Sequence, residues 1–189
     1  MKKSTLAVLI LLAYSGVSFA QGEKYFGIDY AMVNSESTND DWDTGMLFGR
    51  IGMQLQPGLA VEGYLGLGIQ DDETTTPSGC DTQTVSTDSI IGAQIKASAD
   101  LDKVNLHANI GFNQVSATFE ISGAASCYGL GWSETYDDDE TGISFGFGAD
   151  FEISDKSAIS ANYTIFYDDD YAGEDITIGG LLIGYKQAF

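Results

Sequence analysis

The chain has 189 residues with 28 acidic and 8 basic side chains, so its formal net charge at pH 7 is −20. This charge repels nucleic acid phosphates, and we therefore expect no nucleic acid partner. With 23 Gly, only 2 Pro, 12% aromatic residues and no long stretch of helical periodicity, the composition excludes a mainly helical protein and favours one all-β domain.

The first 20 residues have the features of a secretory signal peptide. Two lysines precede an apolar run at residues 6–12, and the small residues Ser18 and Ala20 stand at the spacing that signal peptidase reads. No later stretch approaches the roughly 20 apolar residues of a transmembrane helix. The sequence therefore predicts a signal peptide at 1–20 and a mature domain at 21–189.

Eight runs of about 10 residues, in which large apolar residues recur at every second position, follow along the chain. Such alternation predicts strands, and it is weakest in the eighth run, where Ile178 and Leu182 interrupt the polar row. In chain order the apolar rows are Phe26, Ile28, Tyr30, Met32; Leu47, Ile51, Met53; Leu59, Val61, Leu65, Leu67, Ile69; Ile91, Ala93, Ile95, Ala97; Val104, Leu106, Ala108, Ile110, Phe112; Ile143, Phe145, Phe147, Phe151; Ile159, Ala161, Tyr163, Ile165; and Leu181, Ile183, Tyr185, Phe189.

Short and long connections alternate between these runs. Three are tight turns, and the other four are longer and hold 20 of the 28 acidic residues, counting Asp88 at the edge of the second, with no Lys or Arg. This asymmetry predicts an eight-stranded antiparallel up-and-down transmembrane β-barrel, because outer-membrane barrels have short periplasmic turns and long external loops. The tight turns lie at residues 56–58, 100–103 and 154–157, and the long connections at 34–43, 71–86, 120–140 and 168–175.

The residues that alternate with the large apolar ones, and so form the other face of each strand, distinguish a soluble barrel from a membrane barrel. They are largely Gly, Ala, Ser and Asn, which suit the narrow, filled lumen of eight strands. The apolar row is therefore predicted to face lipid, where a closed barrel satisfies every backbone group between strands. Aromatic residues near the strand ends are predicted to form the interfacial girdles: Tyr25, Phe26, Phe151, Tyr163, Tyr167, Tyr185 and Phe189.

Eight ionisable residues are predicted to share the lumen: Asp29, Arg50, Glu62, Lys96, His107, Asp150, Glu152 and Lys186. Buried charges need partners, so we expect a polar network that fills the barrel. In it, Arg50 pairs with Glu62 across a tight turn, and the carboxylates Asp150 and Glu152 pair with lysines such as Lys96 or Lys186. A narrow ion or proton path through the same residues is the alternative.

Other candidate chemistry is sparse. His107 is the only histidine, and its predicted place near the periplasmic end favours a hydrogen-bonding role, so we expect no catalytic residue, no enzyme and no cofactor. The acidic clusters lack the spacing of an EF-hand loop, so they define no metal site, although weak binding of divalent cations stays open. Cys80 and Cys127 fall in two long connections, and export through an oxidising periplasm predicts a disulfide between them.

The last strand, GLLIGYKQAF, together with the signal peptide and the eight runs, resembles the small outer-membrane β-barrels of the OmpX and OmpA transmembrane-domain type, often described as porin-family or opacity-type proteins. The resemblance implies that the terminal Phe189, with Leu181, Ile183 and Tyr185, forms the signal read by the outer-membrane barrel assembly machinery. Gln187 departs from the apolar or aromatic choice at its place.

The same resemblance implies a place in the outer membrane of a Gram-negative bacterium, in contact with its lipid and lipopolysaccharide. It further implies a structural or surface-interaction role, such as adhesion or envelope protection. We expect a monomer. A narrow small-solute channel and a lipid A-modifying barrel enzyme are the alternative functions.

Overall fold

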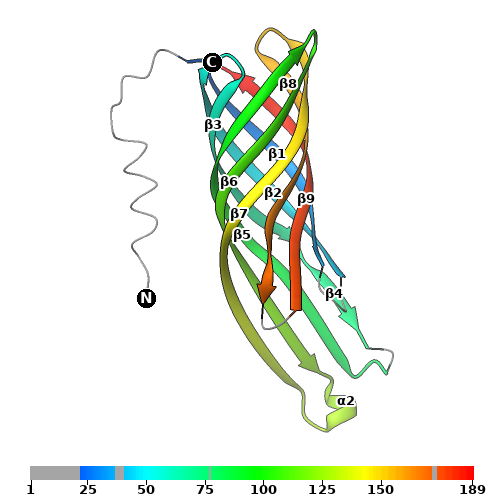
Figure 1. Cartoon of the computed structure of the whole chain (residues 1–189). Coiled ribbons are helices and arrows are strands. Elements are labelled where there is room, and N and C mark those ends of the chain that lie inside the picture. The colour runs from blue at the N-terminus through cyan, green and yellow to red at the C-terminus, as the bar shows by residue number, and fades with distance from the viewer. Residues whose placement is uncertain (1–21, 37–40, 77, 172–173) are drawn as a thin grey trace.

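The computed structural model describes residues 22–36, 41–76, 78–171 and 174–189 (Figure 1). The predicted signal peptide lies outside the described residues. One helical turn and nine strands are present in the described part of the chain: β1 Lys24–Glu36, β2 Asp41–Gln56, β3 Leu59–Gln70, β4 Asp72–Thr75, β5 Asp81–Leu101, β6 Val104–Gly123, α2 Ala125–Tyr128, β7 Trp132–Ser154, β8 Ser157–Tyr171 and β9 Glu174–Ala188. Within these residues, no helix has the length and hydropathy to cross a membrane.

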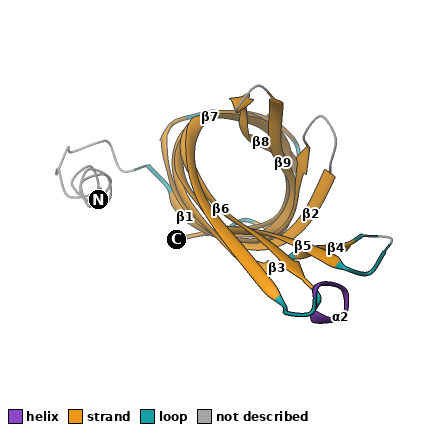
Figure 2. Cartoon of the chain, turned by 90° about the horizontal axis from the view of Figure 1, so that it is seen from below, coloured by secondary structure: helices purple, strands orange, loops and turns teal. Residues whose placement is uncertain are grey.

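The strands close into a ring. Each pairs antiparallel with its neighbours, and the pairs β1–β9 and β3–β5 complete the circle, which Figure 2 shows end-on. β4 pairs with the same edge of β5 as β3 does, so it is the outer piece of the third strand, interrupted at Asp71. The predicted all-β, eight-stranded antiparallel barrel is therefore confirmed, with one strand in two pieces.

The tight turns lie where the sequence predicts them. They join β2 to β3, β5 to β6 and β7 to β8 at one end of the barrel, beside the C-terminus (Figure 1). Gly58 supplies the positive φ of 78° in the first turn, a conformation that residues with a Cβ rarely adopt. Lys103 and Lys156 are turn residues, so basic side chains gather at this end.

The wall of the barrel is apolar outside. In the sixth predicted run, Ile143 and Phe147 are 64% and 65% exposed, whereas the neighbouring Ser144 and Asp150 are 0% and 1% exposed. The same alternation runs along the other strands, because successive side chains of a strand point to opposite faces. An exposed apolar surface that surrounds a closed sheet belongs in hydrocarbon.

The charged side chains of the lumen occupy only one half of it. Toward the end opposite the tight turns it is filled by an apolar plug, in which the Phe48 and Phe166 rings stack with centroids 5.6 Å apart. The prediction of a polar lumen along its whole length is corrected here, because neither lipid nor water reaches this space and apolar packing stabilises it as well. The apolar plug consists of Ala31, Val33, Met46, Phe48, Tyr64, Ile90, Val115, Phe166, Tyr167 and Leu182.

Two of the predicted girdle aromatics face inward instead. Tyr25 shares the inward parity of β1, and its hydroxyl donates a hydrogen bond to Glu62 Oε1 at 2.8 Å. Tyr167 follows a register shift between Ile165 and Tyr167, so both it and Phe166 are buried. A one-residue irregularity moves a side chain to the other face, which periodicity alone does not reveal.

The four predicted long loops are largely strand in the described residues, and the second and third extend farthest. β5 and β6 stay paired from Leu101↔Val104 out to Asp81↔Gly123, and β6 and β7 stay paired out to Gly123↔Trp132. Residues of β5 and β6 such as Thr84, Val85, Phe119 and Ile121 favour a pleated strand in water as in lipid, and the more acidic β7 pairs alongside β6. We call β4 and residues 81–89, 116–123 and 132–141 the outer sheet; it extends past the barrel rim at the end opposite the tight turns (Figure 1).

Candidate functional site

Charged residues from six strands meet in the polar half of the lumen. Arg50 of β2 donates to Asp29 of β1 through two nitrogens, Nε to Oδ2 at 2.5 Å and Nη2 to Oδ1 at 2.8 Å. Its Nη1 lies 3.5 Å from Oε1 of Glu62 on β3, the partner that the sequence predicts. Such a bidentate pair fixes both side chains, and their burial removes the screening of water.

Glu62 is the best satisfied of these carboxylates. Gln94 Nε2 donates to its Oε2 at 2.7 Å, Tyr25 donates to its Oε1, and Lys96 Nζ lies 3.8 Å from Oε1. Only 1% of Glu62 is exposed, so each lost partner would leave part of a charge buried without compensation. The predicted network does not include Tyr25 or Gln94, although both alternate with outward-facing apolar residues in the sequence.

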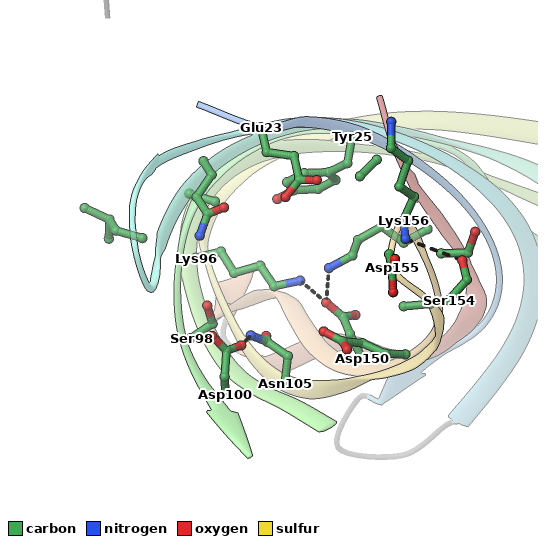
Figure 3. Close-up of a pocket in the computed structure, with 18 residues that line it drawn as sticks. Glu23, Tyr25, Lys96, Ser98, Asp100, Asn105, Asp150, Ser154, Asp155 and Lys156 are labelled. Atoms are coloured by element: carbon green, nitrogen blue, oxygen red, sulfur yellow. Dashed lines mark hydrogen bonds and ion pairs between the residues drawn. The ribbon is translucent and has the colours of Figure 1, made fainter. Parts of the chain in front are cut away.

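A second group forms around Asp150 of β7. Lys96 Nζ lies 3.3 Å from its Oδ2, Lys186 donates to the same oxygen, and Ser160 Oγ donates to Oδ1 at 2.6 Å. Figure 3 shows Lys96 directed at Asp150 across the lumen. The pairing predicted for Asp150 is thus present, and Asp29, Glu62 and Asp150 are balanced by the charges of Arg50, Lys96 and Lys186.

Beyond this network the lumen opens as a vestibule at the tight-turn end. The vestibule has a volume of about 230 Å³ and is lined by polar and charged side chains, among them Glu23, Lys96, Asp100 and Glu152 (Figure 3). Glu152 is exposed there and forms no ion pair with any other described residue, contrary to the predicted pairing. It stands two residues nearer the mouth than Asp150, where water can stabilise its charge.

Among the described residues, His107 forms no Ser-His-Asp arrangement. Its Nε2 donates to Asn162 Oδ1 at 2.5 Å, and its Nδ1 lies 4.0 Å from Asp150 Oδ2, too far for a hydrogen bond. Ser160 donates to Asp150, so its hydroxyl is not paired with the imidazole. A nucleophile needs a base in contact with its proton, and this contact is missing from the arrangement.

The tip of the outer sheet is held by a disulfide. Cys80, before β5, and Cys127, in α2, are bonded with Cα atoms 5.7 Å apart. Beside them the Tyr128 hydroxyl donates to both carboxylate oxygens of Asp81, at 2.9 and 3.1 Å, and this hydrogen bond raises the pKa of Tyr128. The turn between β4 and β5 is therefore tied to the connection between β6 and β7.

Aromatic residues accompany carboxylates on the outer sheet and at the adjoining barrel rim. The Trp42 and Phe119 rings meet edge to face with centroids 5.8 Å apart at the rim, and Tyr136 is 55% exposed farther out. Leu130, between α2 and β7, is 82% exposed. The acidic side chains find hydroxyl partners, such as Thr118 Oγ1 donating to Asp88 at 2.7 Å. In the described segments, no group of three or more His, Cys, Asp or Glu side chains is arranged to hold a metal ion.

The residues of the implied assembly signal lie on the outward face of β9. Leu181, Ile183, Tyr185 and Phe189 are all exposed. The Phe189 ring lies 6.4 Å from the Phe26 ring, and its backbone N–H donates to Lys24 O at 2.9 Å, so the chain end is paired with β1. Recognition by the assembly machinery stays a prediction.

Comparison with known proteins agrees with this architecture. The family model of the outer membrane protein beta-barrel domain matches residues 4–189. The chain belongs to this family. Its place is accordingly the outer membrane of Gram-negative bacteria, where the short turns of such barrels face the periplasm and the longer connections face outward. None of the curated proteins compared with it matches its sequence.

Three solved structures illustrate the likeness. Ail, the attachment invasion locus protein of Yersinia pestis, has a TM-score of 0.62 and 15% identity over 89% of this chain and 99% of its own. Neisserial surface protein A has a TM-score of 0.62 and 15% identity, covering 88% of this chain and 97% of its own. OprG from Pseudomonas aeruginosa has a TM-score of 0.61 and 11% identity, covering 89% and 96%. At these identities the likeness shows that this chain shares their fold. The role of its site has to be argued from its own residues.

Proposed function

We propose that this outer-membrane barrel is a non-catalytic surface protein that binds a partner through the outer sheet and uses the barrel as its anchor. The observation that supports this most is the ordered, disulfide-braced sheet beyond the rim. Flexible loops would lose conformational entropy on binding, whereas a sheet held by Cys80–Cys127 and by strand pairing has already lost it. The exposed Trp132 and Tyr136 belong to the residue types that dominate the energy of protein contacts.

The names of two structural relatives agree in kind with this role. One is an attachment invasion locus protein, and the other is a surface protein. The proposal for this chain rests on its own outer sheet, because the shared fold carries no activity. We include in it a monomer in contact with lipid and lipopolysaccharide, folded by the assembly machinery, with at most weak divalent-cation binding.

The alternatives fit the lumen less well. A steady channel would have to pass the apolar plug, in which Phe48 and Phe166 are 1% and 2% exposed. A lipid A-modifying enzyme would need an activated nucleophile, and the single histidine contacts an amide oxygen instead. We therefore assign the lumen a structural role.

The test is attachment by intact cells. Bacteria of a non-adherent strain that express the full chain should bind host epithelial cells or matrix proteins more than the same strain with an empty vector. The double substitution Trp132→Ser, Tyr136→Ser should lower this binding by about tenfold, because exposed aromatics dominate such contacts. A lipid-facing change, Phe147→Leu, is the matched control and should leave it intact. Equal attachment with and without the protein would overturn the proposal.

A further inference from the structure

The outer part of β7 has a free edge. Along one side β7 pairs with β6 over its whole length, from Trp132↔Gly123 to Phe151↔Val104. Along the other side it pairs with β8 only from Phe145↔Ile165 inward to the tight turn. Residues 132–141 therefore have no strand partner on that side in the described part of the chain, and Figure 1 shows β7 curving away from β8 there. We call this side of residues 132–141 the open edge.

The backbone groups at the open edge can be identified from the pairing. Glu152 N donates to Lys103 O of β6, and the register between the two strands has no shift out to Trp132. Even-numbered residues of β7 therefore direct their N–H and C=O groups to β6, since these directions alternate along a strand. The odd-numbered residues, Ser133, Thr135, Asp137, Asp139 and Thr141, direct theirs to the open edge.

One contact supports this assignment independently. Asp139 N donates at 3.0 Å to the side chain of its neighbour Asp138, not to β6. The N–H of an odd-numbered residue is thus satisfied by a local side chain, as expected where no strand lies opposite. A row of backbone groups with no strand opposite is a template for an added strand.

The charges of the open edge determine which strand can add. Five of its ten residues are acidic, namely Glu134, Asp137, Asp138, Asp139 and Glu140, and none is basic. Their side-chain partners in the described structure are hydroxyls, with Ser116 donating to Asp139 and Tyr136 to Glu134, while Thr118 Oγ1, which donates to Asp88, lies 3.2 Å from Asp137. No cation of the described residues neutralises them. A second copy of this edge would place like charges opposite one another, which disfavours pairing.

We propose that the open edge of β7 binds an extended polypeptide segment that carries Lys or Arg at alternate positions, added as a further strand of the outer sheet. The inference rests on the proposed function and specifies its partner. Alternate positions put all the basic side chains on one face of the added strand. On one side of the outer sheet they would meet Asp137 and Asp139; on the other they would meet Glu134, Asp138 and the exposed ring of Tyr136, which can accept a cation on its π-face.

The test uses the full chain in lipid nanodiscs and synthetic peptides. One probe is a fluorescent ten-residue peptide of alternating Lys and Val, and its counterpart has the same lysines with Pro in place of every second Val. Fluorescence anisotropy at physiological salt should show saturable binding of the first peptide and at least about tenfold weaker binding of the second, which cannot form the ladder. Equal affinity for the two peptides would reduce the site to a diffuse negative surface and overturn strand addition.

A pair of variants locates the site. Thr135→Pro removes an N–H that points to the open edge and leaves every bond to β6, so it should weaken binding of the Lys-Val peptide by about tenfold, whereas Thr135→Ala should leave it within about twofold. Both variants must keep the disulfide and the heat-modifiable migration of a folded barrel. Independently of any variant, the peptide should slow amide hydrogen exchange within residues 132–141 of the unmodified chain. Unchanged exchange at saturating peptide would contradict the proposal.

The two proposals fail separately. If cells with Thr135→Pro attach as well as those with Thr135→Ala while Trp132→Ser, Tyr136→Ser abolishes attachment, the surface role stands and the open edge is not its site. If the unmodified chain binds the Lys-Val peptide but confers no attachment, the site stands and the adhesive role fails.

Discussion

Arg50 is the residue on which the lumen network most depends. It contacts both Asp29 and Glu62, and it joins strands β1, β2 and β3 from the inside. The other cations are less central, because Lys186 is partly exposed and shares Asp150 with Lys96. Removing a buried charge is harmful mainly because its partners stay behind.

We therefore expect Arg50→Met to lower the free energy of unfolding by about 3–5 kcal/mol, since Asp29 and Glu62 would lose their shared cation. Urea unfolding in lipid vesicles, followed by tryptophan fluorescence, measures this. Lys156→Met, in an exposed turn, is the control and should change stability by less than about 1 kcal/mol. A loss of similar size in the two variants would show that the network contributes no more than a surface charge.

At the scale of single elements, the outer sheet depends on its disulfide. Cys80 and Cys127 are 47 positions apart in the chain, and for a loop of this length loop-closure entropy gives up to about 4 kcal/mol. In Cys80→Ser, Cys127→Ser we expect faster amide exchange in residues 81–89 and 116–123, with the heat-modifiable migration of the barrel unchanged. Ser126→Ala is the matched control. Unaltered exchange in the outer sheet would mean that strand pairing alone holds it.

The apolar plug gives a second expectation at this scale. Replacing Phe48 and Phe166 together by Ala removes the stacked pair and should open a narrow conductance in planar bilayers that the unmodified protein lacks. The lipid-facing pair Phe145→Ala, Phe147→Ala should stay silent, because it does not touch the lumen. Silence of a folded Phe48→Ala, Phe166→Ala variant, or conductance of the unmodified protein, would contradict the view that the plug closes the barrel.

The sequence predicts those features of the strands that depend on the period-two alternation of apolar residues. It gave the strand count, the three tight turns and the inward parity of Asp29, Arg50 and Asp150, because each depends on a period of two. It could not separate the plug from the lipid face by residue type, since Phe48 and Phe147 are the same residue in two dry environments. The alternation also does not show where the strands end relative to the membrane rim. Cross-strand pairs such as Val85↔Phe119 favour strand in water as well as in lipid.

At the scale of the whole molecule, the two ends carry different chemistry. The lysines of the barrel are Lys24, Lys103, Lys156 and Lys186 toward the tight turns and Lys96 inside, whereas the outer sheet and the long connections contain no Lys or Arg. A membrane-impermeant amine reagent should therefore leave the protein unlabelled on intact cells and label it once the outer membrane is opened. The variant Leu130→Lys, at a highly exposed outer position, should be labelled on intact cells. Labelling of the unmodified chain on intact cells would reverse the assigned orientation.

The same distribution has a consequence for survival at a cell surface. Trypsin-like proteases cleave after Lys or Arg, and every such bond after residue 21 lies in the barrel or at its periplasmic end. The part that reaches outward, from residue 116 to residue 141 for example, offers these enzymes no cleavage site at all. An acidic composition that selects a basic partner thus also leaves the exposed sheet intact in fluids where such proteases are abundant.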